Sequence, residues 1–368
     1  LLPAAVPAYI IAYTYTDIFE YAGPVQGMLR DFFGWKNSQD YWFPNIRSMG
    51  GAIFVMASVL YPYIYLMART SFISTPISFY QAGSIHGKNI FLNVAIPLAR
   101  PGIVAGLALV LMETISDFGT VDYFALETLT LGVFNVWLGM NSLPGAAQIS
   151  CVLFIFVIVL LSLELIARKR QRFHEKSSGQ SIMNPNQARG LIAIVCFIVC
   201  FVPFLSGFII PFGVLLSFVL KGFAVIDFVA IFSTSLISIT LAMLTAIIVM
   251  ALSIFMIVIS YYKSNNPCRF LIFLSSCGYA FPGTILAVGV VVFIGWLNGL
   301  IYFHLNYFTG GLIVLFFAYT IRFLAVGNGA IRSGIAKIDP SLMDASRTMG
   351  HKFFTVIKKI IVPLIYTN

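Results

Sequence analysis

The chain has 368 residues, of which 60% are apolar and only 10% are charged, and its mean hydropathy is +0.95. Soluble domains carry roughly a quarter charged residues, so this composition excludes a water-soluble protein and indicates an integral membrane protein. Apolar runs reach the roughly 20 residues that a helix needs to cross a bilayer, and strand-like alternation is absent, which excludes an outer-membrane barrel. The net charge of +9 is better explained by basic cytoplasmic loops than by nucleic acid, so no nucleic-acid partner is expected.

The apolar runs predict an all-α, polytopic membrane protein. Basic and polar loops separate the runs, and Pro62 is expected to kink the second one. The predicted spanning segments, in chain order, are residues 1–16, 50–67, 102–121, 146–167, 191–220, 228–261, 270–297 and 310–331.

The positive charges predict the orientation. The densest basic cluster, from Arg168 to Lys176, should be cytoplasmic, and span counting places the loop after Arg69 and the last loop on the same face. The opposite loops 122–144 and 298–309 contain no Lys or Arg. This asymmetry satisfies the positive-inside rule for a multi-pass membrane protein.

An internal repeat divides the chain. Pro7-Ala8-Tyr9 resembles Pro282-Gly283-Thr284, Gly50-Gly51 resembles Gly310-Gly311, and Thr75-Pro76 precedes a glycine much as Asp339-Pro340 does. Six predicted spans separate the two polar loops, and this even number makes the repeats parallel rather than inverted. The predicted domains are a first half 1–167 with loop 70–99, a basic linker 168–190, and a second half 191–368 with loop 332–363.

The repeat also predicts an incomplete chain. By alignment of the halves, about two spans are expected to be missing at each end, so the intact protein would have about twelve.

The last loop is polar and basic between apolar segments. Asp339 can cap a helix that begins at Pro340, and Gly350 can end it, so a short helix, a glycine elbow and a second amphipathic helix are expected. The motif reads Asp344-Ala345-Ser346-x3-Gly350-x9-Ile360-x-Val362-Pro363. It resembles the Glu-Ala-Ala-x3-Gly-x9-Ile-x-Leu-Pro signature of binding-protein-dependent ABC transporter permeases.

The first loop carries a weaker copy of this motif. It reads Gln81-Ala82-Gly83-x3-Gly87, with a shorter interval before Pro97. In that family the loop docks in a groove of a cytoplasmic ATPase subunit, so two loops imply an ATPase dimer, as in a fused double permease with the fold of type I ABC importers. The alternative is an ordinary amphipathic cytoplasmic loop.

Three further blocks resemble the iron(III) transport permeases in particular, namely Pro7–Trp35, Leu60–Arg69 and Leu98–Phe124. The resemblance implies ferric iron as the cargo, a periplasmic iron-binding protein as a second partner, and the bacterial inner (plasma) membrane as the location. Related permeases move thiamine, polyamines, phosphonates or oxyanions, and these cargoes remain alternatives.

Acidic residues near the outer ends of the spans are candidates for the substrate pathway, because carboxylate and phenolate oxygens suit a hard trivalent cation. Glu113 and Asp117 are four apart on an expected helix, Asp122 follows, and Asp17 with Glu20 forms a weaker pair. Alternatively, these acids only cap a helix end. No fixed metal site is indicated, and the five cysteines contain no CxxC pair.

Energy is expected to come from a partner. The nucleotide-binding signature GxxxxGK[ST] does not occur, and no catalytic cluster is visible, so the chain is expected to be neither the ATPase nor another enzyme, and to bind no cofactor itself. ATP would be used by the partner subunit. The rival hypothesis is an ion-coupled secondary transporter, which the parallel repeat disfavours.

Overall fold

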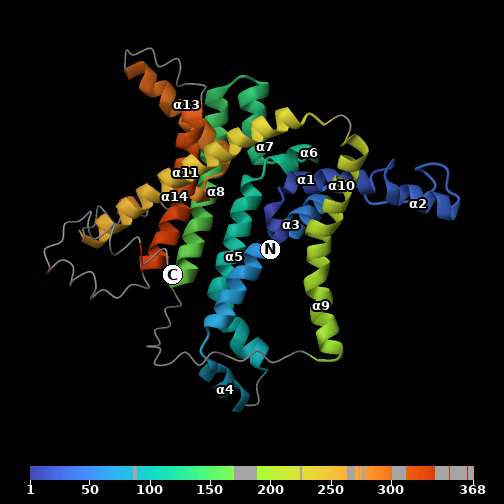
Figure 1. The fold of residues 1–368 in the computed structure, drawn as a ribbon, viewed down its shortest axis with the longest axis horizontal. Helices are drawn as coiled ribbons and strands as arrows, with labels where there is room; N and C mark the ends of the chain where they lie inside the picture. The colour runs from blue at the N-terminus through green and yellow to red at the C-terminus, as the bar shows by residue number, and fades with distance from the viewer. Residues whose placement is uncertain are drawn as a thin grey trace. The chain divides into compact units, whose positions relative to one another are not determined.

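The computed structural model describes residues 1–85, 89–169, 189–223, 226–262, 270–272, 274–275, 278–300 and 312–335, together with Thr348 and Pro363 (Figure 1). These residues form helices and loops without a strand, as the composition predicts. The chain divides into two compact units, residues 1–226 and 227–368.

Among the described residues, five helical stretches are long and apolar enough to cross a membrane. They are Met49–Ile73, Phe91–Ser116, Leu191–Gly222, Phe228–Ser260 and Val314–Arg332. Shorter apolar helices cover Leu129–Gly139, Leu143–Val159 and Gly283–Leu297. The polytopic class predicted from the sequence is therefore confirmed.

The first unit contains most of the described helices. Its elements are η1 (Leu2–Ala5), α1 (Ala8–Phe19), α2 (Pro24–Phe33), α3 (Met49–Ser74), α4 (Ile77–Ile85), η2 (Phe91–Ala95), α5 (Ile96–Ser116), α6 (Gly119–Tyr123), α7 (Leu129–Phe134), η3 (Asn135–Gly139), α8 (Leu143–Lys169), α9 (Leu191–Phe204), η4 (Leu205–Ile209) and α10 (Ile210–Gly222).

The span expected over residues 1–16 is broken. The chain forms the short turn η1 and then α1, which has 12 residues and is too short to cross a bilayer alone. Pro7 stands at the N-cap of α1 in an extended conformation, which separates the two elements. In contrast, α3 begins where expected, because the Ser48 hydroxyl caps it by accepting from Gly51 N at 3.3 Å.

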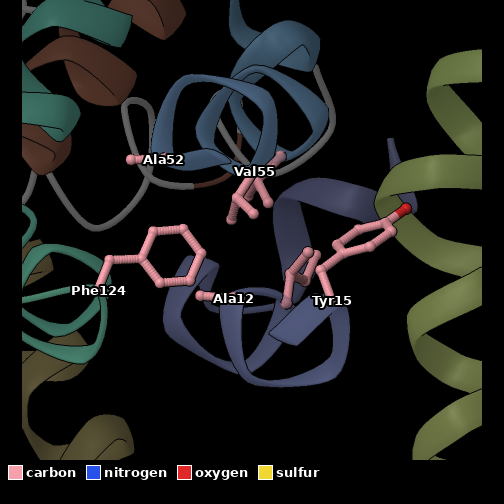
Figure 2. Packing of buried hydrophobic residues seen from close by; sticks show 7 residues of the cluster. Ala12, Tyr15, Ala52, Val55 and Phe124 are labelled. Carbon is pink, nitrogen blue, oxygen red and sulfur yellow. The ribbon is translucent and has the colours of Figure 1, made fainter. Parts of the chain in front are cut away.

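The core of the first unit gathers around α1. Ile11, Ala12 and Tyr15 of α1 pack with residues of α3 and with Phe124, as Figure 2 shows. The Tyr15 hydroxyl donates to the Ser206 carbonyl oxygen at 2.7 Å, which ties η4 to this core. Residues 191–226 therefore pack with the first unit, although the predicted repeat begins its second half at residue 191; that repeat remains a prediction.

Two glycines bring α3 and α5 into close contact. An ideal Cβ at Gly106 would lie 2.7 Å from Ile64 Cα, and one at Gly102 would lie 2.5 Å from the Met67 carbonyl oxygen. This GxxxG spacing lets two helix backbones approach, as it does in many membrane helix pairs. The close fit predicts that α3 and α5 move as one body.

Two widened π-helical turns share a sequence pattern. The turn η2 is followed directly by Ile96-Pro97, and the turn η4 is followed directly by Ile210-Pro211. Ile96 N bonds the Phe91 carbonyl and Ile210 N bonds the Leu205 carbonyl. A proline ring clashes with the carbonyl four residues earlier and offers no donor, and a widened turn relieves both problems.

The second unit contains α11 (Phe228–Tyr262), η6 (Gly278–Ala280), α13 (Gly283–Leu300) and α14 (Leu312–Ile335). Gly327 of α14 lies against α11, since an ideal Cβ there would be 2.7 Å from Val249 Cγ1. Asn328 Nδ2 donates to Ser275 Oγ at 2.8 Å. Helix α14 also packs against η6 and α13.

Candidate functional site

The first candidate coupling loop folds as a separate short helix. Helix α4 follows Thr75 and Pro76, where the Thr75 hydroxyl donates to the Ser71 carbonyl at 2.8 Å and Pro76 cannot continue α3. Figure 1 shows α4 beyond one end of α3 and α5, with α1 and α6 near their other end. The element is therefore attached to the close-packed pair and projects from it.

The motif residues of α4 divide between a packed side and an exposed side. An ideal Cβ at Gly83 would lie 2.6 Å from Val94 Cγ2, so α4 rests on η2 and a side chain at this position would collide with a stiff β-branched neighbour. This contact explains why glycine replaces the second alanine of the family motif. Gln81 and Ala82 are exposed.

Apolar side chains are exposed beside α4. Ile85 is 81% exposed, Phe91 is 60% exposed and Leu92 is 59% exposed. The Asn89 side chain accepts from the backbone nitrogens of Phe91 and Leu92, at 3.0 and 3.3 Å, and so fixes the start of the next helix. Phe91 and Leu92 are the first residues of the candidate span Phe91–Ser116, so they lie at its α4 end. We refer to Ile85, Phe91 and Leu92 as the coupling patch.

Some predicted coupling residues fall outside the described residues. Gly87 of the first loop belongs to this group, as do Asp344, Ala345, Ser346 and Gly350 of the second loop. Pro97 lies in the first turn of α5, shortly after η2, and Pro363 is helical. The ATPase-coupling role of all these residues stays a prediction.

The acidic candidates lie at the other end of α5. Glu113 is in its last turn and is partly buried, whereas Asp117 is the residue that ends the helix, with ψ 114°. The Asp117 carboxylate accepts from the Thr120 backbone nitrogen and from the Thr120 hydroxyl, both at 2.8 Å. Asp117 thus satisfies a backbone N–H in the first turn of α6 from just before its N-cap, Phe118, which is close to the helix-end role considered as the alternative. The two acids do not share a helix face.

The environment of Asp117 changes its acidity. Burial raises the pKa of the Asp117 carboxyl above its ordinary value of 3.8, against the Thr120 hydrogen bonds, which lower it. The nearby Glu113 carboxylate adds a smaller rise in the same direction. An acid with this balance can exchange a proton nearer to neutral pH than an exposed aspartate can.

A cation joins one of the remaining acidic candidates, Glu20, to aromatic residues. Arg47 pairs with Glu20 at 2.6 Å, and its guanidinium lies 5.1 Å from the centre of the Tyr123 ring. Tyr123 in turn meets Tyr13 edge to face at 6.1 Å. Asp17 and Asp122 are exposed.

A cavity of about 350 Å³ opens beside this group. Its walls include Glu20, Tyr41, Trp42 and Asn45. Within the described residues, no group of three or more His, Cys, Asp or Glu could hold a metal ion. The arrangement offers scattered oxygen ligands along a surface rather than one fixed metal site.

Sequence reasoning missed three features of the site. The exposed coupling patch depends on tertiary placement, and so does the position of Arg47 beside Glu20 and Tyr123. The glycine pair Gly102 and Gly106 could have been found, because GxxxG in an apolar segment is a recognised packing signal.

Comparisons with known proteins identify several relatives. No family model and no solved structure matches. The molybdenum transport system permease protein ModB of Haemophilus influenzae is 27% identical over 174 residues, which cover 45% of this chain and 71% of the relative. The putative 2-aminoethylphosphonate transport system permease protein PhnU of Salmonella typhimurium is 25% identical over 173 residues, 45% of this chain and 59% of the relative.

A third relative aligns with nearly the whole chain. The ferric transport system permease protein FbpB of Actinobacillus pleuropneumoniae is 22% identical over 391 aligned residues, covering 99% of this chain and 54% of the relative. The chain therefore spans about half the length of this relative.

Proposed function

We propose that this chain, a homologue of the permease proteins of ABC transport systems, is the membrane-spanning part of an importer for ferric iron. A periplasmic binding protein would deliver the iron, and a separate ATPase dimer would supply the energy. The observation that carries the proposal is the placement of α4 and the acids at opposite ends of one helix pair.

The coupling step follows from that placement. An ATPase subunit that covers the coupling patch would bury Ile85, Phe91 and Leu92, and the hydrophobic effect would stabilise the contact. Closure of the ATPase dimer on ATP would then move α4. Because α3 and α5 are in backbone contact at Gly102 and Gly106, the movement would pass along them as a rigid-body shift.

Helix α5 connects this movement to the acidic end. It has 21 residues, so at 1.5 Å per residue it is roughly 30 Å long, about the thickness of the hydrocarbon core. A displacement at Pro97 would therefore reach Glu113 and Asp117 on the opposite side of the bilayer. Alternating access to the acidic end would result.

Iron is the preferred cargo because the ferric permease aligns with nearly all of the chain. Hard oxygen ligands from Glu113, Asp122, Asp17 and Glu20 suit Fe³⁺ during its passage. A second candidate cargo is an anion such as a phosphonate, which is favoured by the molybdenum and phosphonate permeases among the relatives.

The test is reconstitution of the permease with its ATPase and binding protein in proteoliposomes. ATP-dependent uptake of ferric iron is expected. Glu113→Gln should slow iron uptake while leaving ATPase association unchanged. Uptake of an anion in place of iron would reject the iron assignment, and transport without any ATPase would reject the importer class.

A further inference from the structure

An arginine lies within the membrane-spanning part of α14. Arg322 is near the middle of the helix, inside the apolar stretch Val314–Arg332. A charged side chain at this depth is costly and is a candidate functional residue. No Asp or Glu occurs in the sequence between Asp227 and Asp339, so this long part of the second unit supplies no counterion of its own.

The described surroundings of Arg322 are aromatic and polar rather than acidic. Its guanidinium lies 6.0 Å from the centre of the Tyr279 ring, and among the described residues no carboxylate pairs with it. A cation–π contact of this length offsets only part of the cost of a desolvated charge. The positive charge therefore lacks a full partner in this part of the chain.

The guanidinium lies against the start of α13. An ideal Cβ at Gly283, the first residue of that helix, would lie 2.8 Å from Arg322 Nη1, so the glycine leaves space for the charged group. The first N–H groups of a helix have no partner within the helix, and the helix dipole places partial positive charge at the same end. Two sources of positive potential thus meet at Gly283.

The next residue of α13 carries a buried hydroxyl. Thr284 follows Gly283 in the first turn of α13 and is only 5% exposed, and its Oγ1 has no hydrogen-bond partner within the described structure. An unsatisfied buried hydroxyl costs free energy, which an added acceptor would recover. A compact group of negatively charged acceptor oxygens could serve all three features. It would pair with the Arg322 guanidinium, with the free N–H groups at the start of α13 and with the Thr284 hydroxyl.

We infer that Arg322, Gly283 and Thr284 form a binding site for a small oxyanion. Guanidinium groups and helix N-termini both bind tetrahedral oxyanions well, through charge-assisted hydrogen bonds. The site rests on the proposed function in one respect, because the anion would reach it along the transport path as a ligand that accompanies the metal ion. Lipid phosphates share this chemistry but lie at the bilayer surface, whereas Arg322 is near the middle of its helix.

Isothermal titration of the purified full chain in detergent tests the site, with inorganic phosphate and molybdate as probes. Arg322→Gln and Gly283→Ala are each expected to raise the Kd by roughly tenfold or more, which is the size of the effect of losing one charge-assisted contact. The matched control is Arg332→Gln, which removes an exposed arginine from the last turn of the same helix and should leave the Kd unchanged. Arg322→Lys should retain part of the affinity.

Three results would overturn the site. They are absence of binding by the wild-type chain, an unchanged Kd in Arg322→Gln, and binding of phosphatidylglycerol vesicles but not of the free oxyanions. If thermal melting shows that Arg322→Gln does not fold, the Kd values of Gly283→Ala and Arg322→Lys test the site instead, because both variants keep the positive charge. ATPase association, measured separately on the same variants, reports on the proposed function and not on this site.

Discussion

The two ends of the α3–α5 pair are built differently. At the α4 end, apolar side chains of the coupling patch are exposed and the backbone is held by close glycine packing. At the opposite end, polar groups have partners: Asp117 bonds Thr120, Glu20 pairs with Arg47, and the Thr130 hydroxyl donates to the Ile115 carbonyl at 2.6 Å. The first end resembles half of an interface, whereas at the second end several polar groups are already paired within the chain.

The largest effect is expected from placing charge in the coupling patch. Ile85→Asp should reduce ATPase association by roughly tenfold or more, because a buried interface anchor would become a desolvated carboxylate. Copurification with the ATPase measures it. The matched control is Met28→Asp, a similarly exposed apolar residue in α2 near the opposite end, which should leave association intact. Equal loss in both variants would remove the distinction between the two ends.

The next effect concerns the connection between the ends. Gly106→Ala should destabilise the chain by about 1–3 kcal/mol, because the added methyl group overlaps the α3 backbone at Ile64. Thermal melting in detergent measures this loss, and Gly132→Ala is the control, since no atom lies within 4 Å of its added Cβ. A variant as stable as the control would show that α3 and α5 do not need this contact.

A smaller effect is expected from the pH dependence of Asp117. Since the folded chain raises the pKa of this carboxyl, its protonated form stabilises the fold. That contribution is full below the ordinary value of 3.8 and is lost as the pH rises through the raised pKa. The melting temperature of Asp117→Asn relative to the wild type should therefore increase with pH over this window. A constant difference would contradict the assigned burial.

The smallest effect is expected from the ion pair at the acidic end. Arg47→Gln should change stability by about 0–1 kcal/mol, because both partners are substantially exposed and solvent screens their attraction. Chemical denaturation of the variant against the wild type measures the change. A loss of several kcal/mol would mean that the cation–π contact with Tyr123 is the stronger interaction of Arg47.

Much of the fold follows from apolar run length. The helices α3, α5, α11 and α14 lie close to their predicted ranges, because runs of this length and hydropathy leave few alternatives. The family resemblance drawn from the loop motifs is confirmed by the permease relatives. The terminal segment was harder to predict, because Pro7 divides an apolar run that composition alone treats as continuous.

The candidate site was less predictable. Asp117 was expected inside a helix, but its side chain bonds the backbone of Thr120, and aspartate commonly competes with the helix in this way. The Gly83–Val94 contact joins residues on two elements, and no local pattern encodes their distance. The transport role of the acids and the coupling role of both loops stay predictions.

The widened turn η2 has a consequence for helix engineering. A π-helical turn holds about one residue more than an α-helical turn, and each residue advances a helix face by about 100°. The side chains before η2 are therefore rotated about the helix axis, relative to the positions that a continuous α-helix through α5 would give them. Deleting one residue from Phe91–Ala95 would remove this rotation and turn α4 about the α5 axis, without altering any side chain that α5 packs against α3.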